Sequence, residues 1–240
     1  MDKDEYWLLD SVVESWCPLR WLAAKNVGEV LNKRDHGLSR DELITLLNRL
    51  FQRGDLLARR MGKGVEKQRF TPTQTDIQEA LSGRLDCSYG LTLQGGARWE
   101  DVSKPQWERY LTDWVYADPR EGEIVGSDVR MVKKCVSLSV PGVSVVPGSK
   151  HWDVLKPWQA TYWKVLPLGH RVRYSYYDPQ ERPPESKIGG WFDCEHWEWV
   201  KEVNNWYTRY HGILNKRLMN PFPKQKAVRW NRPGAPLAGN

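Results

Sequence analysis

Residues 37–60 change from a helical to an extended pattern of apolar and polar positions. After Ser39, apolar residues recur at spacings of three and four, which predicts an amphipathic helix with one buried face. Ser39 and Glu42 have the spacing of a capping box, so the helix should begin there, and Gly54 should end it. Asp55–Arg60 then predicts a short edge strand.

The same kind of pattern predicts helices on either side of this segment. Residues 4–15 begin with acids and carry an apolar face, and residues 19–31 form a less regular helical segment interrupted by Gly28. Thr73 and Asp76 have capping spacing at the start of a short helix that ends near Leu81. The first hundred residues are therefore expected to be mainly helical, with a few short strands.

Residues 37–60 resemble the third helix and first wing strand of a winged helix-turn-helix domain of the multiple-antibiotic-resistance-regulator type, a bacterial family. Tyr89–Trp99 is similar to the Tyr-x-Leu-Thr-x-x-Gly segment that leads such domains from the wing into the next helix. The resemblance covers roughly residues 4–100, with the helix at 73–81 inserted in the wing. It implies an architecture rather than a task, because winged helices bind DNA, proteins or neither.

The rest of the chain resembles no family of known activity, and its periodicity differs. We expect a helix over Trp99–Val115, strands within 123–146, a hairpin over 161–177 and a helix over Trp191–Leu218. In the second strand of that hairpin, alternation of apolar and basic residues favours a core-facing and a solvent-facing side over a binding face.

The predicted fold class is therefore α+β. It combines an N-terminal winged helix-turn-helix with a mixed antiparallel-sheet and helix domain. Its expected domains are a winged-helix-like domain at 1–100, a Trp-rich α+β domain at 101–218 and a basic, proline-rich tail at 219–240.

Positive charge is concentrated in two places. Residues 201–240 hold 8 Lys or Arg against one acid, whereas the rest of the chain is balanced, and residues 59–69 hold five basic groups against one acid. Either cluster can contact an anionic partner, although a solvated tail or hairpin would have the same composition. The candidate nucleic-acid contacts are Arg40, Thr45, Asn48 and Arg49 in the third helix, Arg59, Arg60, Lys63, Lys67 and Arg69 in the wing, and Lys224, Lys226, Arg229 and Arg232 in the tail.

Asp41 and Glu42 argue against base reading by the third helix. They place carboxylates where the helix would enter a phosphate-lined groove, unless Glu42 is used in the cap. Contacts to the nucleic-acid backbone are therefore expected to exceed base-specific contacts.

Signatures of chemistry are weak in this sequence. The histidines lack metal-ligand spacing, a Cys194/His196 pair is poorly placed for nucleophilic catalysis, and no glycine loop suits a phosphate cofactor. Asp178 with Glu185 and Lys187 is the nearest arrangement to a metal-dependent nuclease, but these residues fall in a proline-rich loop. We expect no cofactor, no metal and no catalysis.

Two functions remain open. The first is a non-catalytic, regulatory or defence-associated protein that binds double-stranded DNA. The second is a protein-interaction module, such as an immunity, inhibitor or accessory subunit, that docks a protein partner through its Trp- and Tyr-rich C-terminal domain. Four unpaired cysteines and the lack of a long apolar run predict a cytoplasmic protein that is not embedded in a membrane.

Overall fold

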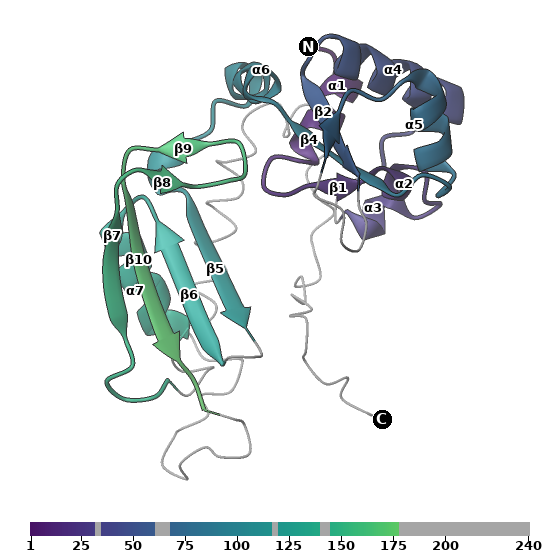
Figure 1. Ribbon diagram of the computed structural model, residues 1–240. Helices are drawn as coiled ribbons and strands as arrows, with labels where there is room; N and C mark the ends of the chain where they lie inside the picture. The colour runs from purple at the N-terminus through teal and green to yellow at the C-terminus, as the bar shows by residue number, and fades with distance from the viewer. Residues whose placement is uncertain (32–34, 61–67, 117–119, 140–144, 178–240) are drawn as a thin grey trace. The chain divides into compact units, whose positions relative to one another are not determined.

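The computed structural model describes residues 1–31, 35–60, 68–116, 120–139 and 145–177 (Figure 1). These residues form a mixed α+β structure whose strands pair in antiparallel fashion. They divide into two compact units. Among the described residues, the N-terminal unit comprises those of 1–104 together with 159–165, and the C-terminal unit comprises those of 105–158 and 166–177.

The helices of the N-terminal unit bury their apolar faces together, as their spacing predicts. They are α1 (Lys3–Asp10), α2 (Leu19–Leu22), α3 (Val27–Val30), α4 (Arg40–Gln52), α5 (Gln74–Leu81) and α6 (Leu93–Ser103).

Two of these helices begin where their caps predict. Ser39 and Glu42 form a capping box at the start of α4, and Thr73 and Asp76 form another at the start of α5. Each box satisfies amide groups that would otherwise lack acceptors in the first turn. Gly54 follows α4 with a φ of 79°, a left-handed conformation that glycine adopts without steric cost. Both predicted helices are confirmed.

A four-stranded antiparallel sheet completes the N-terminal unit. Its strands are β1 (Cys17–Pro18), β2 (Leu56–Arg60), β3 (Arg69–Phe70) and β4 (Cys87–Leu91), in the order β1-β4-β2-β3. β2 therefore lies between two partners: β3, which follows it in the chain, and β4, which follows α5. Thr92 caps α6 directly after β4, which confirms the expected strand-to-helix transition.

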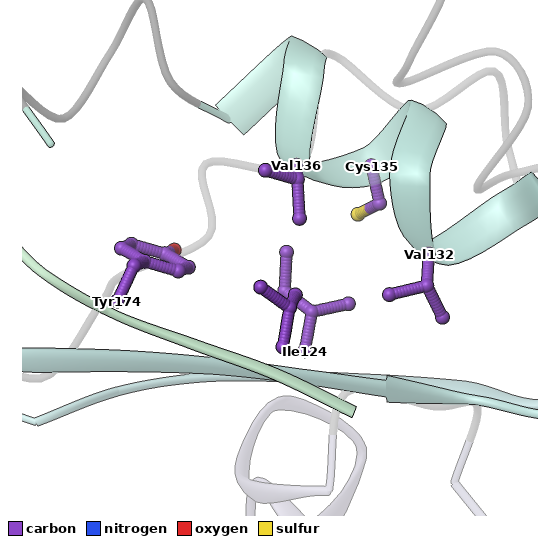
Figure 2. Close-up of a cluster of buried hydrophobic side chains, with 6 residues drawn as sticks. Ile124, Val132, Cys135, Val136 and Tyr174 are labelled. Carbon is purple, nitrogen blue, oxygen red and sulfur yellow. The ribbon is translucent and has the colours of Figure 1, made fainter. Parts of the chain in front are cut away.

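The C-terminal unit places a helix on one face of a second four-stranded sheet. The strands β5 (Leu111–Tyr116), β6 (Glu121–Gly126), β7 (His151–Leu155) and β10 (Gly169–Ser175) pair in the order β5-β6-β10-β7. The helix α7 (Val129–Ser139) packs against β6 and β10. Figure 2 shows Val132, Cys135 and Val136 of this helix directed towards Ile124, with Tyr174 beside them.

One short turn and a two-stranded ribbon remain. A 3-10 turn, η1 (Trp107–Arg109), precedes β5. β8 (Trp158–Gln159) and β9 (Val165–Leu166) pair with each other as a separate two-stranded sheet.

Several predictions for the chain after residue 98 are wrong. The expected helix over 99–115 ends at Ser103, because Lys104 takes a left-handed conformation, and a strand begins at Leu111. Residues 129–139 form a helix instead of strands. The expected hairpin over 161–177 is absent from the described residues, since β10 pairs with β6 and β7. The predicted helix at 191–218 and the tail at 219–240 lie outside the described residues.

The alternation predicted for β10 is confirmed. Val172 and Tyr174 are buried against α7, whereas Arg171 and Arg173 lie on the opposite face, within ion-pair distance of Asp153.

Candidate nucleic-acid interface

Two of the candidate arginines face each other across the β2–β3 pair. Arg59 of β2 stands directly opposite Arg69 of β3, so their side chains leave the same face of the sheet. Arg60 follows Arg59 in β2, so its side chain leaves the opposite face of the sheet; both Arg60 and Arg69 are exposed. We refer to Arg59, Arg60 and Arg69 as the arginine cluster.

Arg59 is fixed in position by an aromatic ring. Its guanidinium carbon lies 4.4 Å from the centre of the Trp16 ring, a distance typical of a cation–π contact. Its Nε is buried and has no hydrogen-bond acceptor among the described residues. Burial lowers the pKa of Arg59, and the like charge of Arg69 lowers it further. Two adjacent guanidinium groups on one face are suited to bind an anion, although the buried Nε of Arg59 is not accessible to one.

Arg60 also lies over a ring, with its guanidinium carbon 5.3 Å from the centre of Phe70. The pKa of Asp76 is lowered mainly by hydrogen bonds from Thr73 in the capping box. The positive charge of Arg60 lowers it further, by a smaller amount. Within the described residues, no carboxylate lies within ion-pair distance of any guanidinium of the arginine cluster. Lys63 and Lys67, the remaining candidates between residues 59 and 69, lie outside the described residues.

The candidates in α4 are placed less favourably. Arg40 and Thr45 are exposed and Asn48 is half-buried, but Arg40 donates a hydrogen bond to the carbonyl of Gln78 in α5, at 3.3 Å. Because α5 packs against α4, part of the helix that would enter a groove is already in contact with protein.

Arg49 is bound by carboxylates. Its Nη2 lies 3.2 Å from Asp2 and 3.1 Å from Glu5. Any phosphate would have to displace these partners, so Arg49 is a poorer candidate than the arginine cluster.

Sequence reasoning missed the charge network to which Arg49 belongs. Glu5 and Asp55 are buried carboxylates, and both Arg53 and Arg98 form ion pairs with each of them. Buried carboxylates need such partners, because desolvation of an unpaired charge is costly. The burial of Glu5 gives no signal in the sequence, since it lies on an acid-rich first turn. These arginines are therefore structural.

Residues 159–165 add two aromatic side chains to the N-terminal unit. The Tyr162 hydroxyl accepts a hydrogen bond from the Leu91 amide and donates one to the Val12 carbonyl, both at 2.5 Å. Trp163 donates to the Val13 carbonyl at 2.8 Å. Tyr162 also lies 5.1 Å from Trp16, between ring centres, so this segment supports the ring that carries Arg59.

The four tail candidates, Lys224, Lys226, Arg229 and Arg232, lie outside the described residues. So do the nuclease-like group Asp178, Glu185 and Lys187, and the Cys194/His196 pair.

Within the described ranges, no three His, Cys, Asp or Glu side chains are grouped as metal ligands would be. Burial raises the pKa of the Cys87 thiol to about 11, so this sulfur is a weak nucleophile near neutral pH. In the described part of the chain, no helix combines the length and the apolar character that crossing a membrane requires.

Comparison of the chain with protein-family models, with curated proteins and with solved structures gave no match. The geometry of the arginine cluster is therefore the basis for assigning a function.

Proposed function

We propose that the N-terminal unit is a winged helix-turn-helix domain that binds double-stranded nucleic acid without catalysis, mainly through phosphate contacts. The order of its elements supports this proposal. A capped helix, α4, leads directly into β2, and β2 pairs with β4, which enters the next helix. β3 and α5 then correspond to an insertion in the wing.

The arginine cluster is the observation that carries the proposal. Arg49, Arg53 and Arg98 are bound by Glu5 or Asp55, whereas no ion pair to a described carboxylate neutralises the cluster. Arg59 and Arg69 can contact phosphate oxygens from one face of the β2–β3 pair, and Arg60, at the end of β2, from the other. Aromatic rings position Arg59 and Arg60. Under this proposal, a phosphodiester backbone supplies the counter-charge that the described carboxylates do not.

Binding of this kind depends steeply on salt and weakly on base sequence. Each phosphate that a cation neutralises releases counterions, and the logarithm of affinity falls with the logarithm of salt concentration by about 0.9 per contact on duplex DNA. Because Arg40 already contacts α5, we expect α4 to contribute little to base recognition. Changing the base sequence of the duplex should therefore change the affinity little.

The experiment is a fluorescence-anisotropy titration of a labelled duplex of about 30 base pairs with the full chain at several salt concentrations. The test variant combines Arg59→Gln, Arg60→Gln and Arg69→Gln. We expect its affinity to fall at least about tenfold and its salt slope to fall by about 2 to 3, because up to three phosphate contacts are lost.

The matched control removes three charges elsewhere, with Lys3→Gln, Arg130→Gln and Lys133→Gln, all at exposed positions. This control should bind nearly as the natural sequence does. If the test variant keeps the slope and affinity of the natural sequence, the cluster is not the interface. If the natural sequence does not bind duplex at low salt, the proposed function is rejected.

A further inference from the structure

β7 forms an edge of the sheet in the C-terminal unit. Among the described residues it pairs with one neighbour, β10, on one side. An edge strand presents backbone amide and carbonyl groups that can pair with another extended chain.

The apolar face of the sheet continues onto this edge. Trp152 is opposite Val172 in the β7–β10 register, so both side chains leave the face that α7 covers. Val172 is fully buried, but Trp152 is 42% exposed and Val154, two residues further on the same face, is 59% exposed. α7 therefore leaves two large apolar side chains accessible at the edge.

On the opposite face of β7, the charged side chains already have partners. The carboxylate of Asp153 accepts hydrogen bonds from Arg171, and His151 and Arg173 lie within ion-pair distance of it. The bond to Arg171 is the main reason that the pKa of Asp153 lies below its usual value. Any preference for a partner therefore comes from the face that carries Trp152 and Val154.

Two exposed lysines flank this apolar pair. Lys150 and Lys156 stand two residues before Trp152 and two after Val154, so positive charge lies at both ends of the apolar stretch. A second copy of this chain is a poor occupant. If two β7 strands paired in antiparallel fashion about Asp153, each Lys150 would face the other copy's Lys156, and like charges opposite each other destabilise a strand pair.

We propose that β7 docks an extended peptide of another protein as an added strand, with alternate apolar residues at its centre and acidic residues at both ends. The apolar residues of the peptide pack beside Trp152 and Val154, and its acids pair with Lys150 and Lys156. This surface belongs to the C-terminal unit and does not depend on the proposed nucleic-acid function.

The test uses two fluorescein-labelled peptides of about nine residues with the same alternating Val and Thr centre, one with two Glu at each end and one with two Lys. Their binding to the full chain is measured by anisotropy. We expect the Glu peptide to bind the natural sequence at least about fivefold more tightly than the Lys peptide. The double variant Lys150→Glu/Lys156→Glu should reverse this preference, and Trp152→Ser should weaken both peptides.

The matched control, Lys3→Glu/Lys25→Glu, makes the same change of charge in the N-terminal unit and should keep the original preference. If neither peptide binds, the proposal is overturned. The two lysines would then serve only to prevent β7 from pairing with another strand. An unchanged preference in the Lys150→Glu/Lys156→Glu variant would also overturn it. So would sedimentation showing a dimer of the natural sequence that Trp152→Ser dissociates, because a second copy would then occupy the strand.

Discussion

The Tyr162 hydroxyl offers the sharpest test of whether residues 159–165 belong to the N-terminal unit. It accepts from the Leu91 amide and donates to the Val12 carbonyl. Leu91 is 1% exposed and Val12 is fully buried, so no solvent would replace the lost partner. Burial raises the pKa of Tyr162 far above its ordinary value, which keeps the hydroxyl protonated and able to donate.

Tyr162→Phe removes this hydroxyl and keeps the ring. A buried polar group left without a partner costs about 1–3 kcal/mol, and the substitution orphans two of them. We therefore expect the N-terminal unit to lose about 2–6 kcal/mol of stability. In native-state hydrogen exchange this corresponds to exchange about 30- to 20,000-fold faster in the globally protected amides of the unit.

The assay is hydrogen exchange followed by mass spectrometry, read on peptides covering residues 85–104 of the N-terminal unit and 166–177 of the C-terminal unit. The control is Tyr177→Phe, the same deletion at a half-buried tyrosine of the C-terminal unit. If Tyr162→Phe accelerates exchange in 85–104 no more than Tyr177→Phe does, residues 159–165 do not stabilise this unit.

Three further predictions concern the N-terminal unit. Asp55→Asn should cost about 3 kcal/mol or more in urea unfolding, because it leaves Arg53 and Arg98 beside a neutral buried amide; an unchanged midpoint would contradict this. Ser39→Ala should cost about 1 kcal/mol by losing the capping box of α4, and a full loss of helical circular dichroism would show a different role. Cys87 should resist an aromatic disulfide reagent at pH 8 and react once urea unfolds the chain, since its pKa is about 11; its labelling in native buffer would show that burial fails to protect it.

Local chemistry made the capped helices predictable. The capping boxes of α4 and α5 each involve residues three apart, so a sequence window of a few residues contains the whole signal. The strand after α4 was predictable from the alternation of Asp55–Arg60, but its expected place at an edge of the sheet is wrong, because β2 pairs with both β3 and β4.

The prediction of strands for the α7 segment was wrong because its amino-acid composition favours a strand, whereas the spacing of its apolar residues favours a helix. Val129, Val132 and Val136 are β-branched, which favours strands, but their spacing of three and four is helical. Burial of the resulting stripe against Ile124 of β6 outweighs the intrinsic preference of valine. The period was the better guide in this segment.

The site could be predicted only in part, because it depends on contacts between distant residues. Arg49 has the same local pattern as a groove-facing arginine, yet Asp2 lies 47 residues earlier in the chain and binds it. The support for Trp16 comes from Tyr162, whose hydroxyl reaches Val12 across 150 residues. Local sequence patterns contain no information on either of these long-range contacts.

The arginines of the N-terminal unit therefore divide by the carboxylates around them. Arg53 and Arg98 are partly buried against Glu5 and Asp55. Dissolved salt screens these ion pairs only weakly, so the two arginines stabilise the folded unit. The arginine cluster lies on the β2–β3 pair, where Arg60 and Arg69 are exposed and solvent ions compete directly for their charge. Like charges directly opposite each other destabilise a strand pair, so the Arg59–Arg69 pair should cost the free protein some stability. Under the proposed function, a phosphate backbone would relieve that repulsion as well as supply contacts.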